Sequence, residues 1–279
     1  MVKDMIVHLD GSERDDIALA HGEALAAQFE ARLVGLYTNV FQTRFMPADL
    51  GGGTSADIIA DILDQARRAG DDTEHRLRQR FELLRSDCEL RRVDGSEGDL
   101  VQAVAHYARC HDIMIMLRPY GEDRPRWVQL TEAALFAGGR SVYLVPPAMP
   151  APSRLDTVVV AWRDTFESTR AIAEAMPFLK RAASVILAAV EDPEEEGEDA
   201  AEGLLEMARH LERHGVQITV RRLPRRGKIS EMLLNECQRA AADLLVMGAY
   251  GHTRFREWIL GGTTRSILSQ ASLPVLMAH

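Results

Sequence analysis

The chain has 279 residues, 46% apolar and 27% charged, so it can bury the core of one large or two ordinary globular domains. Its net charge is −9, and its arginines are interspersed with acids, which argues against nucleic-acid binding. Three scattered cysteines without metal-ligand spacing, no membrane-length apolar run and no secretory leader lead us to expect a cytoplasmic protein with no metal site and no membrane insertion.

Apolar strands alternate with helical stretches along the first half of the chain. In chain order, the pattern predicts strands at 2–9, 31–40, 88–93, 112–117 and 141–146, and helices after Ser12, at 56–85, at 97–110 and before the last strand. Such alternation is typical of parallel βαβ units with right-handed crossovers. The loop 39–55 carries three consecutive glycines, and we interpret it as a lid or an interdomain contact.

The second half repeats this order. Strands are predicted at 155–162, 182–192, 216–223, 243–248 and 274–279, with charged helices at 199–214 and 228–240. The proline-rich segment 146–154 reads as a stiff linker. We therefore predict an α/β fold of two tandem doubly wound, five-stranded parallel-sheet domains of Rossmann-like type, 1–147 and 154–279. The acidic run 191–203 is interpreted as a solvated loop and helix start.

The final strand of each half is short and apolar, so a free edge there would invite pairing. The two strands can pair with each other within the chain, which predicts intrachain pairing of the two domains. Further association into a homodimer is a second expectation.

A glycine pattern follows the fourth strand of the second half. It reads Gly248-x2-Gly251-x9-Gly261-Gly262-Thr263-Thr264. Glycines permit a sharp turn and close approach of a ligand, and a helix N-terminus offers free N–H groups to an anion. The pattern is neither a Walker A loop nor a dinucleotide fingerprint. On its own it fits two interpretations equally: a phosphate cradle, or a turn with threonine as helix N-cap.

This spacing resembles the nucleotide-binding signature of the universal stress protein family. MIVHLDGSERDDIALAHG, with Asp10, looks like the family's N-terminal segment, and SLPVLMAH looks like its last strand, so the chain resembles the tandem type. The resemblance implies an adenine nucleotide α-hydrolase-like fold and an ATP, ADP or AMP site, with Mg²⁺ as an optional companion. It places Gly248, Gly251 and Gly261 around the nucleotide, Gly262, Thr263 and Thr264 at its phosphates, Val190, Ala161 and Trp162 at the base and ribose, Met247 behind them, and Arg163, Asp164 and His252 at the rim.

Two positions depart from the family pattern. Arg163 stands where the family's nucleotide binders usually carry aspartate, with Asp164 one place late. Gly262 stands where they usually carry serine or threonine, and Thr263 is one step on. An arginine at the rim favours a phosphate or excludes the base, and the sequence leaves both outcomes open.

The first half lacks the glycines. When the halves are aligned, Leu117 and Tyr120 replace Gly248 and Gly251, and Val128, Gln129 and Leu130 replace Gly261 to Thr263. Side chains there should block backbone approach to a phosphate, so we expect this half to be degenerate. Asp10, Gly11 and Ser12 are then interpreted mainly as a turn and helix cap.

The sequence thus predicts a stress-response protein that binds an adenine nucleotide in its second half and acts by binding. It is not expected to be an enzyme, although slow ATP hydrolysis stays open. The alternative is a nucleotide-independent scaffold or regulatory protein assembled through its final strands. A nucleotide α-hydrolase enzyme is a weaker alternative, because no SGGxDS-type loop follows the first strand.

Overall fold

The computed structural model of the chain describes residues 1–41, 54–84, 87–120, 125–191, 198–249 and 262–279, with backbone alone at 54–59, 125–126 and 198–200. The strands are β1 (Asp4–Leu9), β2 (Arg32–Val40), β3 (Cys88–Gly95), β4 (Ile113–Leu117), β5 (Ser141–Val145), β6 (Thr157–Trp162), β7 (Ser184–Glu191), β8 (Ile218–Pro224), β9 (Leu244–Gly248) and β10 (Val275–Ala278). The helices are α1 (Asp15–Phe29), α2 (Thr54–Glu82), α3 (Glu97–Arg109), α4 (Pro125–Glu132) with a π-helical continuation η2 (Ala133–Ala137), α5 (Phe166–Leu179), α6 (Glu198–Arg213), α7 (Ile229–Arg239) and α8 (Gly262–Gln270).

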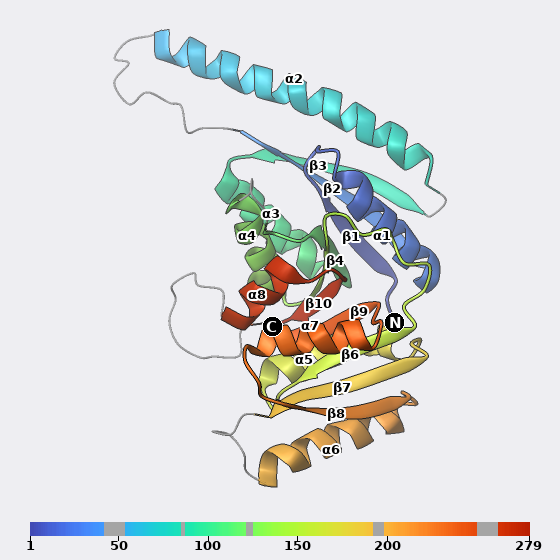
Figure 1. Ribbon diagram of the computed structural model, residues 1–279. Coiled ribbons are helices and arrows are strands. Elements are labelled where there is room, and N and C mark those ends of the chain that lie inside the picture. Colours follow the sequence, from blue (N-terminus) through green and yellow to red (C-terminus); the bar gives the residue numbers. More distant parts are fainter. Residues whose placement is uncertain (42–53, 85–86, 121–124, 192–197, 250–261) are drawn as a thin grey trace.

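Within the described residues, the ten strands form a single sheet, in the order β3-β2-β1-β4-β5-β10-β9-β6-β7-β8 (Figure 1). Neighbours within each run of five are parallel. At the centre, β5 and β10 pair antiparallel, with Tyr143 opposite Leu276. The winding of each half reverses beside its first strand, β1 or β6, which confirms the predicted doubly wound α/β fold.

Helices cover both faces of the sheet because its strands are apolar on both sides. Val158 and Val160 of β6 pack in one cluster with α1, α2, α5 and α6, whereas Val159 between them packs in another with α3, α4, α7 and α8. Alternate residues of a strand point to opposite faces, so continuous apolar runs require a helical layer on each side. Among the described residues, no helix is both long and apolar enough to cross a membrane.

The two halves also pack side by side beyond the strand pair. The rings of Phe29 in α1 and Phe178 in α5 meet edge to face with centroids 4.8 Å apart, and the Arg181 guanidinium lies 4.5 Å from the Phe29 centroid. Arg118 donates to the Ala271 carbonyl across the centre at 2.6 Å. The predicted linker lies against α1, where His21 Nε2 is 3.1 Å from the Met149 carbonyl oxygen. The division into domains 1–147 and 154–279 stays a prediction.

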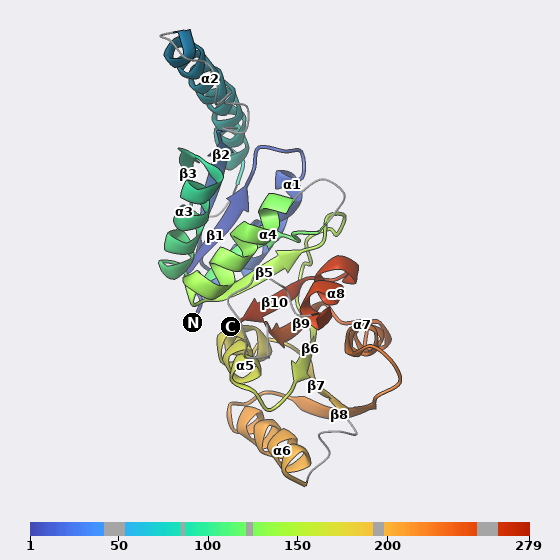
Figure 2. The ribbon, with the colours of Figure 1, turned by 90° about the vertical axis from the view of Figure 1, so that its left-hand side faces the viewer.

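Helix α2 extends beyond the edge of the sheet, as Figures 1 and 2 show. Arg92 of β3 fastens its C-terminal part: the guanidinium donates to Asp71 and to Glu74 (3.1 Å) in α2, to Asp94 on its own strand (2.8 Å) and to the Arg67 carbonyl (3.1 Å). The Arg92 side chain is only 11% exposed. One guanidinium thus donates hydrogen bonds to three carboxylates at this junction.

Replacing Arg92 should loosen α2. We expect Arg92→Met to lower the free energy of unfolding by about 1–2 kcal/mol, because three carboxylates lose their shared donor in a partly solvated place. Urea unfolding measures the loss, and hydrogen exchange should become faster within 66–82. Arg68→Met is the matched control, since Arg68 is 79% exposed and pairs with Asp64 of the same helix at 3.0 Å. Equal effects of the two changes would contradict the role given to Arg92.

Candidate functional site

The carboxyl ends of β6, β7 and β9 meet at one edge of the second half. β6 lies between the other two, with Ala161 opposite Met247 of β9 and Ala188 of β7. In open parallel sheets the crevice at such a reversal is where ligands bind. The structure therefore brings together the strand ends to which the sequence assigned the nucleotide.

An apolar floor forms at this edge. Met247 is buried, and Ala161 and Val190 are half-buried against the same cluster, which also contains Ile267 of α8. Trp162 follows Ala161 on the strand, so its indole lies on the opposite face, buried with α5 and α6. The structure thus groups three of the expected base-contacting residues and separates Trp162 from them.

Packing accounts for one of the glycines. A Cβ on Gly248 would lie 2.7 Å from both the carbonyl carbon of Glu167 and the amide nitrogen of Ser168, at the start of α5. Real Cβ atoms do not approach backbone so closely, so Gly248 is needed for α5 to rest on β9. This glycine alone therefore gives no evidence for a ligand.

Gly262 behaves differently. It is exposed, and apart from its chain neighbours and the backbone of its own helix, no described atom lies within 4 Å of the place where its Cβ would be. It opens α8, so the expectation that a threonine caps this helix is wrong: Thr263 and Thr264 belong to the first helical turn. Thr263 is half-buried and Thr264 is buried. A glycine that no described neighbour requires, at a helix N-terminus, leaves room for a ligand to meet the backbone N–H groups.

Three predicted site residues, Gly251, His252 and Gly261, lie outside the described residues, as do most of loop 39–55 and part of the acidic run. Arg163 and Asp164, both exposed, follow β6. The Asp164 carboxylate is turned toward α6, where a Cβ on Gly203 would lie 3.2 Å from Oδ2. Neither residue belongs to the apolar clusters that form the floor.

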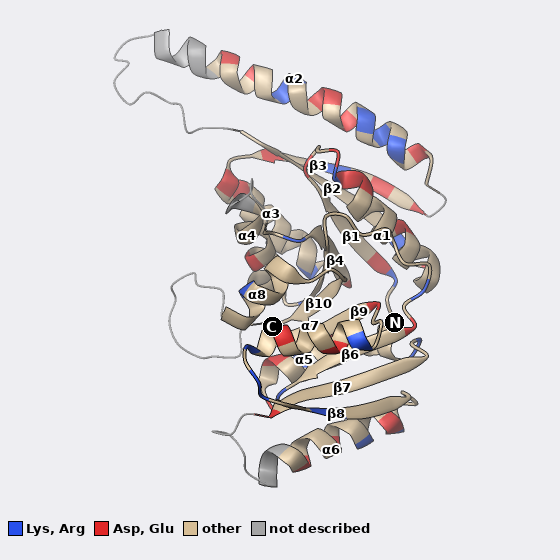
Figure 3. Ribbon diagram, in the orientation of Figure 1, with Lys and Arg blue, Asp and Glu red and all other residues tan. Residues whose placement is uncertain are grey.

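Basic residues gather beside this edge, a signal that the sequence reasoning missed. Pro224, the last residue of β8, is level with Glu191 at the end of β7. Arg225, Arg226 and Lys228 follow it, all exposed. Figure 3 shows their colour on the connection between β8 and α7. The run RRLPRRGK, residues 221–228, was visible in the sequence and brings cations to the edge, close to the acidic residues that follow β7.

Comparison with known proteins finds a match over the second half of the chain. Residues 155–279 match the family described as Universal stress protein family. We call these residues the universal stress protein half.

A curated protein and a solved structure are also similar to this chain. A stretch of 66 residues is 39% identical to Universal stress protein Slr1230 of Synechocystis sp. (strain ATCC 27184 / PCC 6803 / Kazusa), covering 24% of this chain and 22% of that protein's length. The crystal structure of a universal stress protein from Archaeoglobus fulgidus DSM 4304 is similar over 99% of this chain and 95% of that one, with a TM-score of 0.75 and 17% identity. That similarity shows that the whole chain shares its fold.

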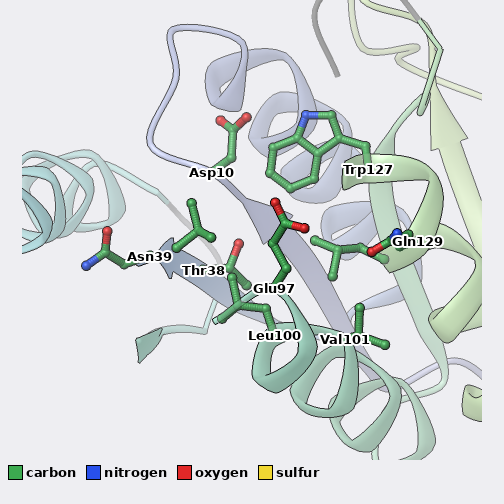
Figure 4. A pocket seen from close by; sticks show the side chains of 10 residues that line it. Asp10, Thr38, Asn39, Glu97, Leu100, Val101, Trp127 and Gln129 are labelled. Carbon is green, nitrogen blue, oxygen red and sulfur yellow. The ribbon is translucent and has the colours of Figure 1, made fainter. Parts of the chain in front are cut away.

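The half that precedes the universal stress protein match has a cavity at its corresponding edge. It measures about 200 Å³ and lies among the ends of β1 and β2, the start of α3 and helix α4. Figure 4 shows Asp10, Thr38, Glu97, Trp127 and Gln129 around it. The sequence predicts that bulky side chains here block the backbone approach to a phosphate. Trp127, Gln129 and Leu130 line the cavity, and that prediction stays a prediction.

The turn after β1 only partly matches its prediction. Gly11 has φ of +83°, as a tight turn requires, and Ser12 donates its N–H to the Asp10 carboxylate at 2.8 Å. The expected helix cap from Ser12 is not formed, because the N-cap of α1 is Arg14 and no side-chain hydrogen bond caps it. Asp15, the first residue of the helix, instead accepts the N–H groups of Asp10 (3.0 Å) and Gly11 (2.7 Å).

Asp15 should make stability depend on pH. Burial, followed by the nearby Asp10 carboxylate, raises the pKa of Asp15 to about 8. The Asp15 carboxyl of the folded protein therefore keeps a proton that the unfolded chain loses near pH 4. The contribution of Asp15 to the free energy of unfolding is complete below about pH 4 and is lost as the pH rises toward 8. Asp10→Asn should lower the pKa of Asp15 and flatten the loss. Carbon-13 NMR titration of the Asp15 carboxyl measures its pKa, and urea unfolding at pH 5 and 8 measures the loss of stability. An Asp15 pKa that is the same in Asp10→Asn as in the unmodified protein would contradict the effect of Asp10 on Asp15.

Proposed function

We propose that the universal stress protein half binds an adenine nucleotide, ATP, ADP or AMP, and that the protein acts in a cytoplasmic stress response through this binding. The base would rest on the floor formed by Ala161, Val190 and Met247. The phosphates would meet the N-terminus of α8. The family match of residues 155–279 supports the assignment of the site to this half.

The open position at Gly262 carries the proposal. Among the glycines considered for the cradle, Gly248 is explained by its contact with α5, but no described neighbour requires a glycine at 262. Free N–H groups in the first turn of α8 offer hydrogen bonds and a positive dipole end to a phosphate. Arg225, Arg226 and Lys228 add positive charge at the same edge.

Binding rather than rapid chemistry is the activity that we propose. Within the described residues, no three His, Cys, Asp or Glu side chains gather where they could hold a metal. A Mg²⁺ ion would therefore arrive with the phosphates and neutralise part of their charge. Slow hydrolysis of bound ATP is compatible with such a site.

We also propose that the first half, residues 1–147, is a diverged second domain of the same family. Its strand order, β3-β2-β1-β4-β5, repeats that of the universal stress protein half, β8-β7-β6-β9-β10. The equivalent helices bury equivalent positions, with Ala134 and Leu135 matching Ile267 and Leu268. A scaffold assembled through its final strands is less favoured, because β5 and β10 each already have strand neighbours on both sides.

Filling the open glycine should abolish nucleotide binding. Gly262→Val puts a branched side chain where the phosphate would approach, and we expect the affinity for ATP, ADP or AMP to fall by at least about tenfold in calorimetric titration. Gly98→Val is the matched control, since Gly98 lies in the first turn of α3 with only Ser96 Oγ, at 3.9 Å, near its Cβ position. Unchanged affinity in a folded Gly262→Val protein would contradict the site. Gly248→Val is unsuitable, because it disturbs α5.

The basic residues after β8 should strengthen the binding of ATP more than the binding of adenosine. In the double variant Arg225→Gln and Arg226→Gln, we expect ATP affinity to fall by about tenfold or more and adenosine affinity to change little, because adenosine has no phosphate. Arg209→Gln on α6 controls for the loss of a surface charge. If adenosine weakened as much as ATP, the arginines would be acting on the fold or the base rather than on phosphate.

A further inference from the structure

A hollow lies at the amino ends of the second-half strands, opposite the edge to which the nucleotide is assigned. It measures about 450 Å³ and is enclosed by the C-terminal part of α7, the end of α8 and the loops that lead into β9 and β10. Figures 1 and 2 show α7 and α8 next to each other. Small-molecule sites usually measure roughly 300–1,000 Å³, so the hollow is large enough for a compact ligand.

The first half packs its equivalent elements closely. There a Cβ on Gly138, just after η2, would lie 2.7 Å from the Cβ of Ala108 in α3, and Arg109 donates to the Ala137 carbonyl at 2.6 Å. The alignment of the halves places Ala271 at the position of Gly138. The methyl group of Ala271 keeps α7 from approaching α8 as closely as α3 approaches η2. The hollow is thus a feature of the second half's own residues and not a requirement of the fold.

Apolar side chains form the floor of the hollow, and neutral polar groups form its rim. Leu273 and Cys237 are buried, and Leu234 is half-buried. The rim carries three carboxamides and one hydroxyl, all on exposed residues: Asn235, Gln238, Gln270 and Ser272. None of these four side chains makes a hydrogen bond with a described residue. Each carboxamide therefore offers one acceptor and two donors to a ligand.

The lining favours an uncharged ligand. None of the nine described residues that line the hollow is charged or a histidine, so an ion would lose hydration there without gaining a counter-charge. Helices α7 and α8 end at Arg239 and Gln270, and the negative end of each helix dipole disfavours an anion such as phosphate. The nearby Arg118 is engaged by the Ala271 carbonyl. A neutral ligand with N–H donors fits this environment.

We propose that this hollow binds a small, uncharged, planar molecule with an N–H donor beside a C=O acceptor, as in a lactam, a ureide or a primary carboxamide. Such an edge pairs with a side-chain carboxamide through two hydrogen bonds, as Asn and Gln pair with nucleobases. Gln238 and Gln270 come from the two helices that flank the hollow, and the ring would lie against Leu234 and Leu273. This assignment is independent of nucleotide binding at the opposite edge of the sheet.

Uracil and nicotinamide are suitable probes, one a cyclic ureide and the other a primary carboxamide on a ring. We expect at least one to bind the full-length protein saturably in NMR titrations that follow the side-chain amide signals of Asn235, Gln238 and Gln270. The N-methylated counterparts, 1,3-dimethyluracil and N,N-dimethylnicotinamide, keep the ring and the carbonyl but lack the N–H donor. The counterpart of whichever probe binds should bind at least about fivefold more weakly than that probe.

Variants assign the site. The double change Gln238→Met and Gln270→Met removes hydrogen bonds with little change of side-chain length, and it should weaken the probe by at least about fivefold. Gln102→Met, at an exposed place in α3, is the matched control and should leave the affinity within about twofold. Gly262→Val, at the other end of α8, should also leave it unchanged. Circular dichroism and thermal unfolding verify that each variant is folded.

Four outcomes would overturn the proposal. The first is failure of both probes to saturate below about 10 mM. The second is a methylated counterpart that binds as tightly as its probe. The third is unchanged affinity in a folded Gln238→Met and Gln270→Met protein. The fourth is displacement of the probe by AMP together with loss of probe binding in Gly262→Val, which would place the probe in the nucleotide site.

Discussion

The antiparallel pairing of β5 with β10 is the interaction on which the rest of the structure depends. It joins two parallel half-sheets into one sheet of ten strands and gives each final strand a neighbour on both sides. Tyr143 and Leu276, opposite each other at this junction, are fully or almost fully buried. Because the strands of one half run against those of the other, each half keeps its own carboxyl edge.

The order and type of the elements could be predicted because they depend on local periodicity. Val158 to Val160 indicate a strand covered on both faces whatever their distant neighbours are. The role of Gly248 could not be predicted, since it depends on the backbone of α5, some eighty residues earlier. Similarly, which face Trp162 occupies and where α8 begins depend on register and on tertiary packing. The glycine pattern that starts at Gly248 could not by itself separate a packing glycine, Gly248, from an open one, Gly262.

The first-half cavity was missed for a related reason. Val128 and Gln129 in place of two glycines predict that a phosphate is no longer accommodated, but they do not indicate whether the space is closed. Whether bulky side chains fill a crevice or line it depends on where α4 lies relative to β1 and α3. The informative residues in the sequence were charged ones. Asp10 and Glu97 mark the carboxyl edge of the first half, and the run of arginines after β8 marks that of the second half.

The linker between the halves determines how a substitution in the gene affects each half. In an assembly of two identical chains, every substitution appears twice, so a change that remodels one site remodels both. Here the segment 146–154 joins both halves in one polypeptide. A substitution at the carboxyl edge of one half therefore leaves the residues at the other edge unchanged. The contacts at the centre, Phe29 on Phe178 and Arg118 on Ala271, could thus be retained while the residues at the two edges diverged. The tether separates the selection that maintains the fold from the selection that acts on each carboxyl edge.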